Sequence, residues 1–265
     1  MTVRLTREIR FTLTGRPPTS AAVMNSWGGW PSAALLAPFL QLRCTVEGEP
    51  AAIAGYVCNV KLIDNAFRQF GLPEVARLYE VQGENLAPGE LLTSVWSEVA
   101  RQLPDTAPLV SLELLVTPML KYEILKDSLD MIRVTQQFEF SAAHRLHCQE
   151  LSDEENREHF GKCNNPSGHG HNYRLDVTVV QPTGNDASRL SVVDLEQVVK
   201  QQVIDRFDHK HLNEDTEEFR QLNPTVENIA STVWFLLDGE LSPAVLDAVR
   251  VYETPKTWAE CRGDE

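Results

Sequence analysis

Apolar and polar residues alternate along several short segments in the second half of the chain. The alternation covers residues 132–140 and 173–179, and it predicts strands that each have one apolar face. Residues 194–206 read as a helix with Asp194 near its start, and residues 226–238 read as a second helix with apolar residues at core spacing. Strands paired as hairpins, with helices on one face, make an antiparallel α+β layer.

The first half of the chain repeats this order of elements. FLQLRCTVEG (39–48) is similar to NYRLDVTVVQ (172–181), and LAPGELLTSVWSEV (86–99) is similar to PTVENIASTVWFLL (224–237). The paired segments lie 133 and 138 residues apart, so only small insertions separate the copies. We therefore expect a tandem duplication of a strand–strand–helix–helix–strand–strand unit.

The joint between the two copies is expected in YEILKDSLD, residues 122–130. This placement predicts a first domain of residues 1–126 and a second of residues 127–265. All seven histidines lie between His144 and His211, so any histidine-dependent metal chemistry belongs to the second domain.

The composition narrows the class of protein. The formal charge is −14, and a nucleic-acid binder is disfavoured because phosphate backbones are held by clustered Lys and Arg. The chain has no run of 18 apolar residues and no basic-then-apolar N-terminal segment, so we expect neither a membrane span nor a signal peptide. Five widely spread cysteines argue against a disulfide framework and for a reducing, cytoplasmic location.

Histidines stand where two of the apolar strand faces end. His169 and His171 share the face of Tyr173, and His144 has the parity of Phe140. Neighbouring antiparallel strands can bring these ends together, and three neutral imidazoles make a Zn²⁺ site that keeps a fourth position open. The simpler alternative is that His-Gly-His is a polar turn before a strand. The parity match with His144 favours the metal site.

Cys163 and the pair Asp208-His209 are candidates for proton transfer. A thiol near Zn²⁺ and a histidine would have a lowered pKa and could accept a proton. Cys163 could also be a fourth zinc ligand or a small buried residue. His209, polarised by the Asp208 carboxylate, could accept or donate protons, or the pair could form a helix cap.

Glu253 is a candidate for a substrate contact. It follows the parity of Val249 and Val251, so its carboxylate should face inward and need donors, which a guanidine-like ring edge would supply. Thr225 and Glu227 open the second helix, where capping and dipole stabilisation already account for them.

Five segments of the second half carry a family resemblance: FSAAHRL, FGKCNNPSGHGHNY, FDHKHLN, PTVENIA and VYET. In this order and spacing, over about residues 132–255, they resemble the 6-pyruvoyl tetrahydropterin synthase family, which includes 6-carboxytetrahydropterin synthase. The resemblance implies the tunnelling fold, a ββααββ unit. Such units have antiparallel sheets that assemble side by side into an oligomeric barrel, with pterin sites between units.

The resemblance also implies roles for single residues. Zinc would be held by His144, His169 and His171. Cys163 would be the general base, with Asp208 and His209 as a proton relay. Glu253 would anchor the pterin, and Thr225 and Glu227 would belong to the pterin pocket. A basic patch would hold a triphosphate, with Arg145, Lys162 and Lys210 as candidates.

The first half departs from the family pattern. It has no histidine, Val116 stands where Glu253 does, and Gly89 or Glu90 falls where Glu227 sits. NSWGGWPS (25–32) occupies the place of the Cys and His-Gly-His segment. We expect a degenerate copy that keeps the fold and has a structural role. Because barrel closure removes free sheet edges, the tandem chain should form homo-oligomers, and three chains would give the six units common in the family.

The resemblance implies a zinc-dependent carbon–oxygen lyase that converts 7,8-dihydroneopterin triphosphate to 6-pyruvoyl tetrahydropterin. The alternative product, 6-carboxytetrahydropterin, requires acetaldehyde release and leads toward 7-deazaguanine and queuosine synthesis. The five-residue gap between Cys163 and His169 resembles the pyruvoyl-forming pattern. A folate-pathway branch often has a glutamate near His-Gly-His, and none stands between residues 163 and 171. A catalytically silent pterin-binding scaffold is the alternative from another class.

Overall fold

The computed structural model describes residues 1–13, 29–30, 32, 36–184 and 189–263. Most of the segment 25–32, which was matched to the Cys and His-Gly-His segment, lies outside these residues. None of the helices in the described ranges combines the length and the apolar character that a membrane crossing requires.

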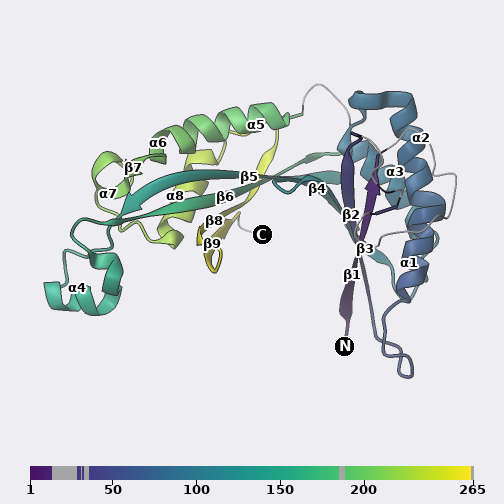
Figure 1. Cartoon of the computed structure of the whole chain (residues 1–265), viewed down its shortest axis with the longest axis horizontal. Coiled ribbons are helices and arrows are strands. Elements are labelled where there is room, and N and C mark those ends of the chain that lie inside the picture. The colour runs from purple at the N-terminus through teal and green to yellow at the C-terminus, as the bar shows by residue number, and fades with distance from the viewer. Residues whose placement is uncertain (14–28, 31, 33–35, 185–188, 264–265) are drawn as a thin grey trace. The chain divides into compact units, whose positions relative to one another are not determined.

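The chain divides into two compact units (Figure 1). The first comprises Met1–Val134 with Gln181–Ala187, and the second comprises Thr135–Val180 with Ser188–Glu265. Strand β5 (Ser128–His144) contributes its beginning to the first unit and its end to the second. The expected domain boundary after residue 126 therefore stays a prediction, since one strand belongs to both units.

In the first unit, an antiparallel sheet carries helices on one face. Its strands follow one another in the order β1 (Val3–Thr12), β2 (Phe39–Gly48), β3 (Leu109–Thr117) and β4 (Leu120–Leu125). Cys44 lies opposite Leu112, and Leu112 lies opposite Ile124. All three side chains are fully buried, so this register places one apolar row under the helices.

The helices of the first unit begin and end at residues suited to those positions. They are α1 (Val60–Ala66), the π-helical turn η1 (Phe67–Gly71), α2 (Leu72–Gln82), the 3₁₀ turn η2 (Gly83–Asn85) and α3 (Pro88–Ala100). The Asn59 side chain accepts a hydrogen bond from the Lys61 amide and caps α1. Pro88 opens α3, where a missing amide hydrogen costs no helical hydrogen bond.

The second unit has the same plan. From the end of β5, its antiparallel sheet continues with β6 (His169–Pro182), β8 (Val245–Thr254) and β9 (Thr257–Arg262), and the short β7 (Lys210–His211) pairs parallel to β5. The helical segments are α4 (Asp153–Phe160), η3 (Gly161–Asn164), α5 (Val192–Val199), η4 (Lys200–Ile204), α6 (Asp205–Phe207), α7 (Leu212–Asp215) and α8 (Val226–Leu237). Helix α8 packs on β8 and β9. The predicted α+β class with antiparallel sheets is confirmed.

The two units share a detail that the alternation pattern alone does not contain. In each unit the first long helix is interrupted by a π-helical turn, residues 67–71 in one and 200–204 in the other. The predicted helix 194–206 is therefore α5, η4 and α6 in succession. A π turn inserts one extra residue into the helix, and its recurrence at the expected offset of 133 supports the tandem duplication.

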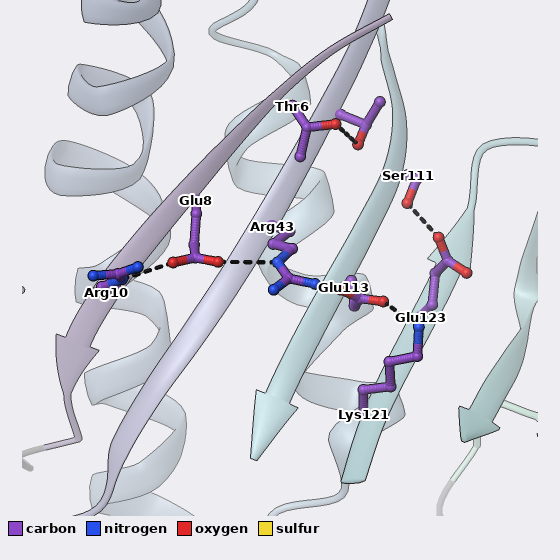
Figure 2. Close-up of polar contacts among 9 residues, drawn as sticks. Thr6, Glu8, Arg10, Arg43, Ser111, Glu113, Lys121 and Glu123 are labelled. Atoms are coloured by element: carbon purple, nitrogen blue, oxygen red, sulfur yellow. Dashed lines mark hydrogen bonds and ion pairs between the residues drawn. The ribbon is translucent and has the colours of Figure 1, made fainter. Parts of the chain in front are cut away.

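Charged side chains line the face of the first sheet that lies opposite its helices (Figure 2). Glu8 accepts hydrogen bonds from Arg10 and Arg43, at 2.6 and 3.0 Å. Glu113 accepts from Arg43 and from Lys121, each at 2.9 Å. The result is a ladder of three cations and two carboxylates in which each carboxylate contacts two cations, and Arg43 joins β1 to β3. Pairing of this kind stabilises the sheet.

This ladder predicts an asymmetry between two carboxylates of the first unit. Glu113 is mostly buried, with 11% of its side chain exposed, and Glu113→Gln should lower the free energy of unfolding by about 1–2 kcal/mol. Glu49 pairs with the amino terminus at an exposed site, so Glu49→Gln should change it by less than about 0.5 kcal/mol. Urea denaturation of both variants measures the difference, and equal effects would mean that the ladder is not cooperative.

Candidate metal centre

Three histidines converge where β5 ends and β6 begins. His144 is the last residue of β5, and His169 and His171 open β6. One ring nitrogen from each lies within 4.8 Å of the other two. The His144 Nε2 and His169 Nε2 atoms are 3.1 Å apart. The structure thus brings together the three residues that parity placed at the ends of two strand faces.

The protein orients the His144 ring by a hydrogen bond but leaves nitrogens of the other two rings without a hydrogen-bond partner. His144 is fully buried, and its Nδ1 donates to the Pro224 carbonyl at 2.7 Å, which leaves Nε2 as the bare nitrogen of a neutral ring. The His169 Nδ1 and His171 Nε2 atoms are buried without a hydrogen-bond partner. A carbonyl that holds the far nitrogen of one ring, together with three ring nitrogens that converge, fits a Zn²⁺ ion.

Burial sets the protonation of this cluster. It lowers the pKa of His144 from 6.5 to about 4, and it also lowers the pKa of His171. Neutral imidazoles are the form that binds a metal, so the environment prepares both rings as ligands.

Glu253 stands beside the trio on the inward face of β8. Its Oε1 lies 3.5 Å from His144 Nε2 and 3.6 Å from His171 Nε2. Its neighbours on the same face, Val249 and Val251, are fully buried, as the alternation of β8 requires. Glu253 therefore faces inward as expected, and its carboxylate adds a negative charge to an otherwise neutral cluster.

Cys163 lies in η3 and is held near the end of β5. Its carbonyl accepts from the Leu146 amide at 2.9 Å, two residues beyond His144. Burial, and then the charge of Glu253, raise the pKa of the Cys163 thiol. This direction is opposite to the expected lowering, because the groups of this chain that surround the sulfur desolvate a thiolate and repel it. The pKa of the Cys163 thiol can therefore be lowered only by positive charge added near the sulfur.

Asp208 and His209 form a hydrogen-bonded pair next to β5. His209 Nδ1 lies 2.8 Å from Asp208 Oδ2, while Asp208 Oδ1 accepts from the Ser141 amide at 2.8 Å. The Ser141 bond and His209 hold the pKa of Asp208 below its usual value. His209 has φ of 57°, a strained value for a non-glycine residue that the Ser141 carbonyl supports through the His209 amide. No hydrogen bond or ion pair joins this pair to the trio within the described residues.

Thr225 and Glu227 begin α8 as predicted, and the helix-capping alternative applies to Thr225. Its hydroxyl accepts from the Asn228 amide at 3.3 Å. Glu227 is exposed in the first turn. The preceding Pro224 carbonyl is the partner of His144, so the start of α8 does adjoin the metal centre. Pterin-pocket roles for Thr225 and Glu227 stay predictions.

His211 is a neighbour of the site that sequence reasoning did not single out. Its Nδ1 is buried without a partner, and its positive form would lower the pKa of His144. A Cβ on Gly168 would lie 2.6 Å from His211 Nε2 and 2.9 Å from the His144 carbonyl. Gly168 also has φ of 66°, so only glycine lets the His-Gly-His segment approach β5 this closely. In the sequence, Gly168 directly before His169 was the one available sign that another segment packs closely against this motif.

Comparisons with known proteins concern the second half of the chain. A family model described as 6-pyruvoyl tetrahydropterin synthase matches residues 133–264. The 6-pyruvoyl tetrahydrobiopterin synthase of Drosophila melanogaster is 41% identical over 132 residues, which are 49% of this chain and 79% of that protein. The Homo sapiens protein of the same name is 40% identical over 135 residues, 50% of this chain and 92% of that protein. The chain belongs to the 6-pyruvoyl tetrahydropterin synthase family.

Further matches cover about half of the chain. The structure of Caenorhabditis elegans 6-pyruvoyl tetrahydropterin synthase shares 40% sequence identity, with a TM-score of 0.45, and covers 51% of this chain and 96% of that chain. The 6-carboxy-5,6,7,8-tetrahydropterin synthase of Haemophilus influenzae is 28% identical over 153 residues, 49% of this chain and 98% of that protein. The family model leaves residues 1–132 outside its match, and all three histidines of the trio lie inside it.

Gly168 allows a direct test of the packing around the metal centre. Gly168→Ala should weaken Zn²⁺ binding at least about tenfold, because the new methyl group displaces His211 or the end of β5. Gly170→Ala is the matched control, since its Cβ would meet only the Ala142 carbonyl at 3.5 Å. Competition with a chromogenic chelator measures both affinities. Equal affinities would show that the close approach of Gly168 has no role in metal binding.

Burial of His144 predicts a pH dependence of the metal-free protein. In the unfolded chain His144 takes up a proton near pH 6.5, whereas in the folded protein it does so only near pH 4. The unfolded state therefore binds more protons between these two pH values, and the free energy of unfolding falls as the pH drops through this window. Between about pH 7 and about pH 5.5 the loss should be about 1 kcal/mol. Urea denaturation with a chelator present measures it. The slope should flatten in His144→Asn and persist in His159→Asn, which removes an exposed imidazole.

Proposed function

We propose that the chain is a zinc-dependent lyase that converts 7,8-dihydroneopterin triphosphate to 6-pyruvoyl tetrahydropterin with loss of triphosphate. The observation that carries the proposal is the convergence of His144, His169 and His171 beside Glu253. The names of the Drosophila and human relatives support the reaction. The family model covers residues 133–264, which contain all four of these residues.

His144, His169 and His171 would hold the zinc ion. The bound ion supplies Lewis acidity, which polarises the hydroxylated side chain of a substrate and acidifies its C–H bonds. The chain itself fixes the tautomer of His144, since the Pro224 carbonyl holds His144 Nδ1–H.

Glu253 is proposed to anchor the pterin: its carboxylate would accept hydrogen bonds from the N–H donors on the guanidine-like edge of the pterin ring. The partly buried carboxylate has imidazole nitrogens of His144 and His171 at 3.5 and 3.6 Å, and neutral rings are poor partners for its charge. Two N–H donors of a heterocycle match a carboxylate in a bidentate arrangement. Substrate binding would thereby disperse the charge that raises the pKa of Cys163.

Cys163 is proposed as the general base that moves a proton at the substrate side chain. Its thiol is partly buried and is made less acidic by this chain's own groups. A cation held by the trio would act against both causes of that shift, so the base forms only in the assembled site. Asp208 and His209 are proposed as the relay that exchanges this proton with solvent, because 83% of the His209 side chain is exposed.

The first unit is proposed to be a degenerate copy, with residues 1–126 as a structural domain and residues 127–265 as the catalytic one. Val116 takes the place of Glu253, and the carboxylates of the ladder around Arg43 are both occupied by cations of the same sheet. Strands β1 and β9 each pair on one side only among the described residues. Edges of this kind favour a homo-oligomer, which we propose contains three chains. We also propose a cytoplasmic location, because five free cysteines fit a reducing compartment.

The alternative product is 6-carboxytetrahydropterin, and the Haemophilus relative is the observation that favours it. That relative is 28% identical, against 40% or more for the Drosophila and human proteins. The five-residue gap between Cys163 and His169 also favours the pyruvoyl product.

Product analysis tests the proposal. The zinc-loaded protein, incubated with 7,8-dihydroneopterin triphosphate, should release triphosphate and form 6-pyruvoyl tetrahydropterin without acetaldehyde, as measured by chromatography. Cys163→Ala should lower turnover about 10²–10⁴-fold, as expected for loss of a general base. Cys148→Ala, which removes a partly exposed thiol paired with Glu150, should retain full turnover. Acetaldehyde release would establish the alternative product, and absent turnover would support a silent scaffold.

A further inference from the structure

Asparagine side chains hold the loop that follows the metal centre. Strand β5 ends at His144, and residues 145–148 belong to no strand or helix. The backbone N–H and C=O groups of this partly buried loop still need partners, because unpaired polar groups are costly away from water. Three asparagines from other segments supply them, and they are Asn164, Asn213 and Asn223.

Asn213 adds one rung to the pairing of β5 with β7. Its Oδ1 accepts from the Arg145 amide at 2.8 Å, and its Nδ2 donates to the Arg145 carbonyl at 3.0 Å. A side-chain amide has the donor and the acceptor of a peptide group, so it can pair with both backbone groups of one residue. Because Ala143 already pairs with His211, Asn213 continues the same pairing two residues further along each segment.

Asn164 joins the turn that carries Cys163 to the same loop. The Leu146 amide donates to the Cys163 carbonyl at 2.9 Å, and Asn164 Nδ2 donates to the Leu146 carbonyl at 2.7 Å. Asn164 Nδ2 also lies 3.1 Å from His147 Nδ1. Asn164 is buried, so a lost donor there is poorly replaced by water. The paired bonds on Leu146 therefore fix the backbone of Cys163 close to the end of β5.

Asn223 supplies the third contact, from the segment that precedes α8. Its Oδ1 accepts from the His147 amide at 3.2 Å, and its carbonyl accepts from Asn228 Nδ2 at 2.8 Å. The next residue, Pro224, is the partner of His144 Nδ1. This segment therefore holds both the ring of a proposed metal ligand and the loop that follows it.

The relay pair Asp208–His209 is fixed to β5 on both sides of His144. Before His144, the backbone of Ser141 donates to Asp208 and accepts from the His209 amide. After it, Arg145 pairs with Asn213, which lies four residues beyond His209. The loop 145–147 is thus the place where the segments of the proposed base, the proposed relay and a proposed metal ligand are bonded together.

We infer that Asn164 and Asn213 are positioning residues. They act through the backbone of residues 145–147 and hold Cys163 and the relay pair Asp208–His209 at fixed places relative to His144. The inference rests on the proposed function for the roles of those groups. Proton transfer requires heavy atoms within hydrogen-bond reach, and a misplacement of about 1 Å is enough to lower turnover about 10²-fold.

Substitutions at Asn213 test the added rung. Asn213→Leu removes both bonds with little change in size, whereas Asn213→Asp keeps the acceptor for the Arg145 amide and loses the donor. In the zinc-loaded chain, kcat should fall about 10²-fold in the Leu variant and about tenfold in the Asp variant. KM and the Zn²⁺ affinity should stay within about threefold, because substrate and metal contacts are retained. Asn165→Asp is the matched control, since it keeps the acceptor for the Ser167 amide and should retain full kcat.

Alkylation of Cys163 tests Asn164 without any turnover. Asn164→Asp has the same shape but cannot donate to the Leu146 carbonyl, so the turn should loosen and expose the thiol. Iodoacetamide labelling of the zinc-loaded chain, resolved by peptide mass spectrometry, should be at least about threefold faster at Cys163 than in Asn165→Asp. Labelling of Cys148 is the internal reference. Circular dichroism checks folding, and the shorter, uncharged Asn164→Ser provides the same test if the Asp variant does not fold.

The outcomes separate the positioning role from the proposed reaction. Faster labelling of Cys163 in Asn164→Asp, with no turnover even in the unmodified chain, would support the positioning role and reject the lyase. Turnover with the same kcat in the unmodified chain, Asn164→Asp and Asn213→Leu would reject the positioning role and leave the lyase intact. A lowered melting temperature with unchanged kcat would show a purely structural role for both asparagines and would also overturn the inference.

Discussion

The pairing of β5 with β6 is the constraint on which the site depends. It sets the last residue of one strand, His144, against the first residues of the other, His169 and His171. Thr135 bonds Thr178 at 2.9 Å on the opposite face of this pair, so both faces confirm a single alignment. A slip of one residue would put His144 on the opposite face of the sheet from His169 and His171. The buried Tyr173 and Phe140 rings, stacked 5.0 Å apart, oppose such a slip.

The site combines groups whose interactions are unfavourable as long as no ligand is bound. A partly buried carboxylate, three converging imidazoles and a thiol of raised pKa share one region, and Glu253 disfavours the thiolate at Cys163. On the other side of His169, Arg145 and Lys162, which were expected to hold a triphosphate, line a cavity. A positive metal ion and an anionic, donor-bearing substrate offset each of these costs. Frustration of this kind is typical of functional sites, where the fold over-determines an arrangement that is unfavourable by itself.

Strand periodicity predicted the trio and Glu253 because ligand and core residues lie on the same face of a strand. The same reasoning could not find Asn213 or His211. Asn213 lies on the short helix α7, whose four residues are too few to show an apolar period. His211 approaches Gly168 through β7, a parallel pairing of two residues that has no periodic signal. The raised pKa of Cys163 was not predicted either, because it is caused by burial and by Glu253, and the fold alone brings these together.

The first unit, which we propose is a degenerate copy, offers a physical account of how a fold can persist without its site. Its core residues, such as Leu42, Leu112 and Ile124, keep the parity that packs the sheet against helices. Phe11, near the end of β1, is buried much as His144 is at the end of β5. An apolar ring there stabilises a core directly and needs no metal, whereas a buried imidazole needs one partner for each nitrogen. Once metal binding is no longer required, substitution of ligands by apolar residues removes the unfavourable groups while the register that positioned them is retained.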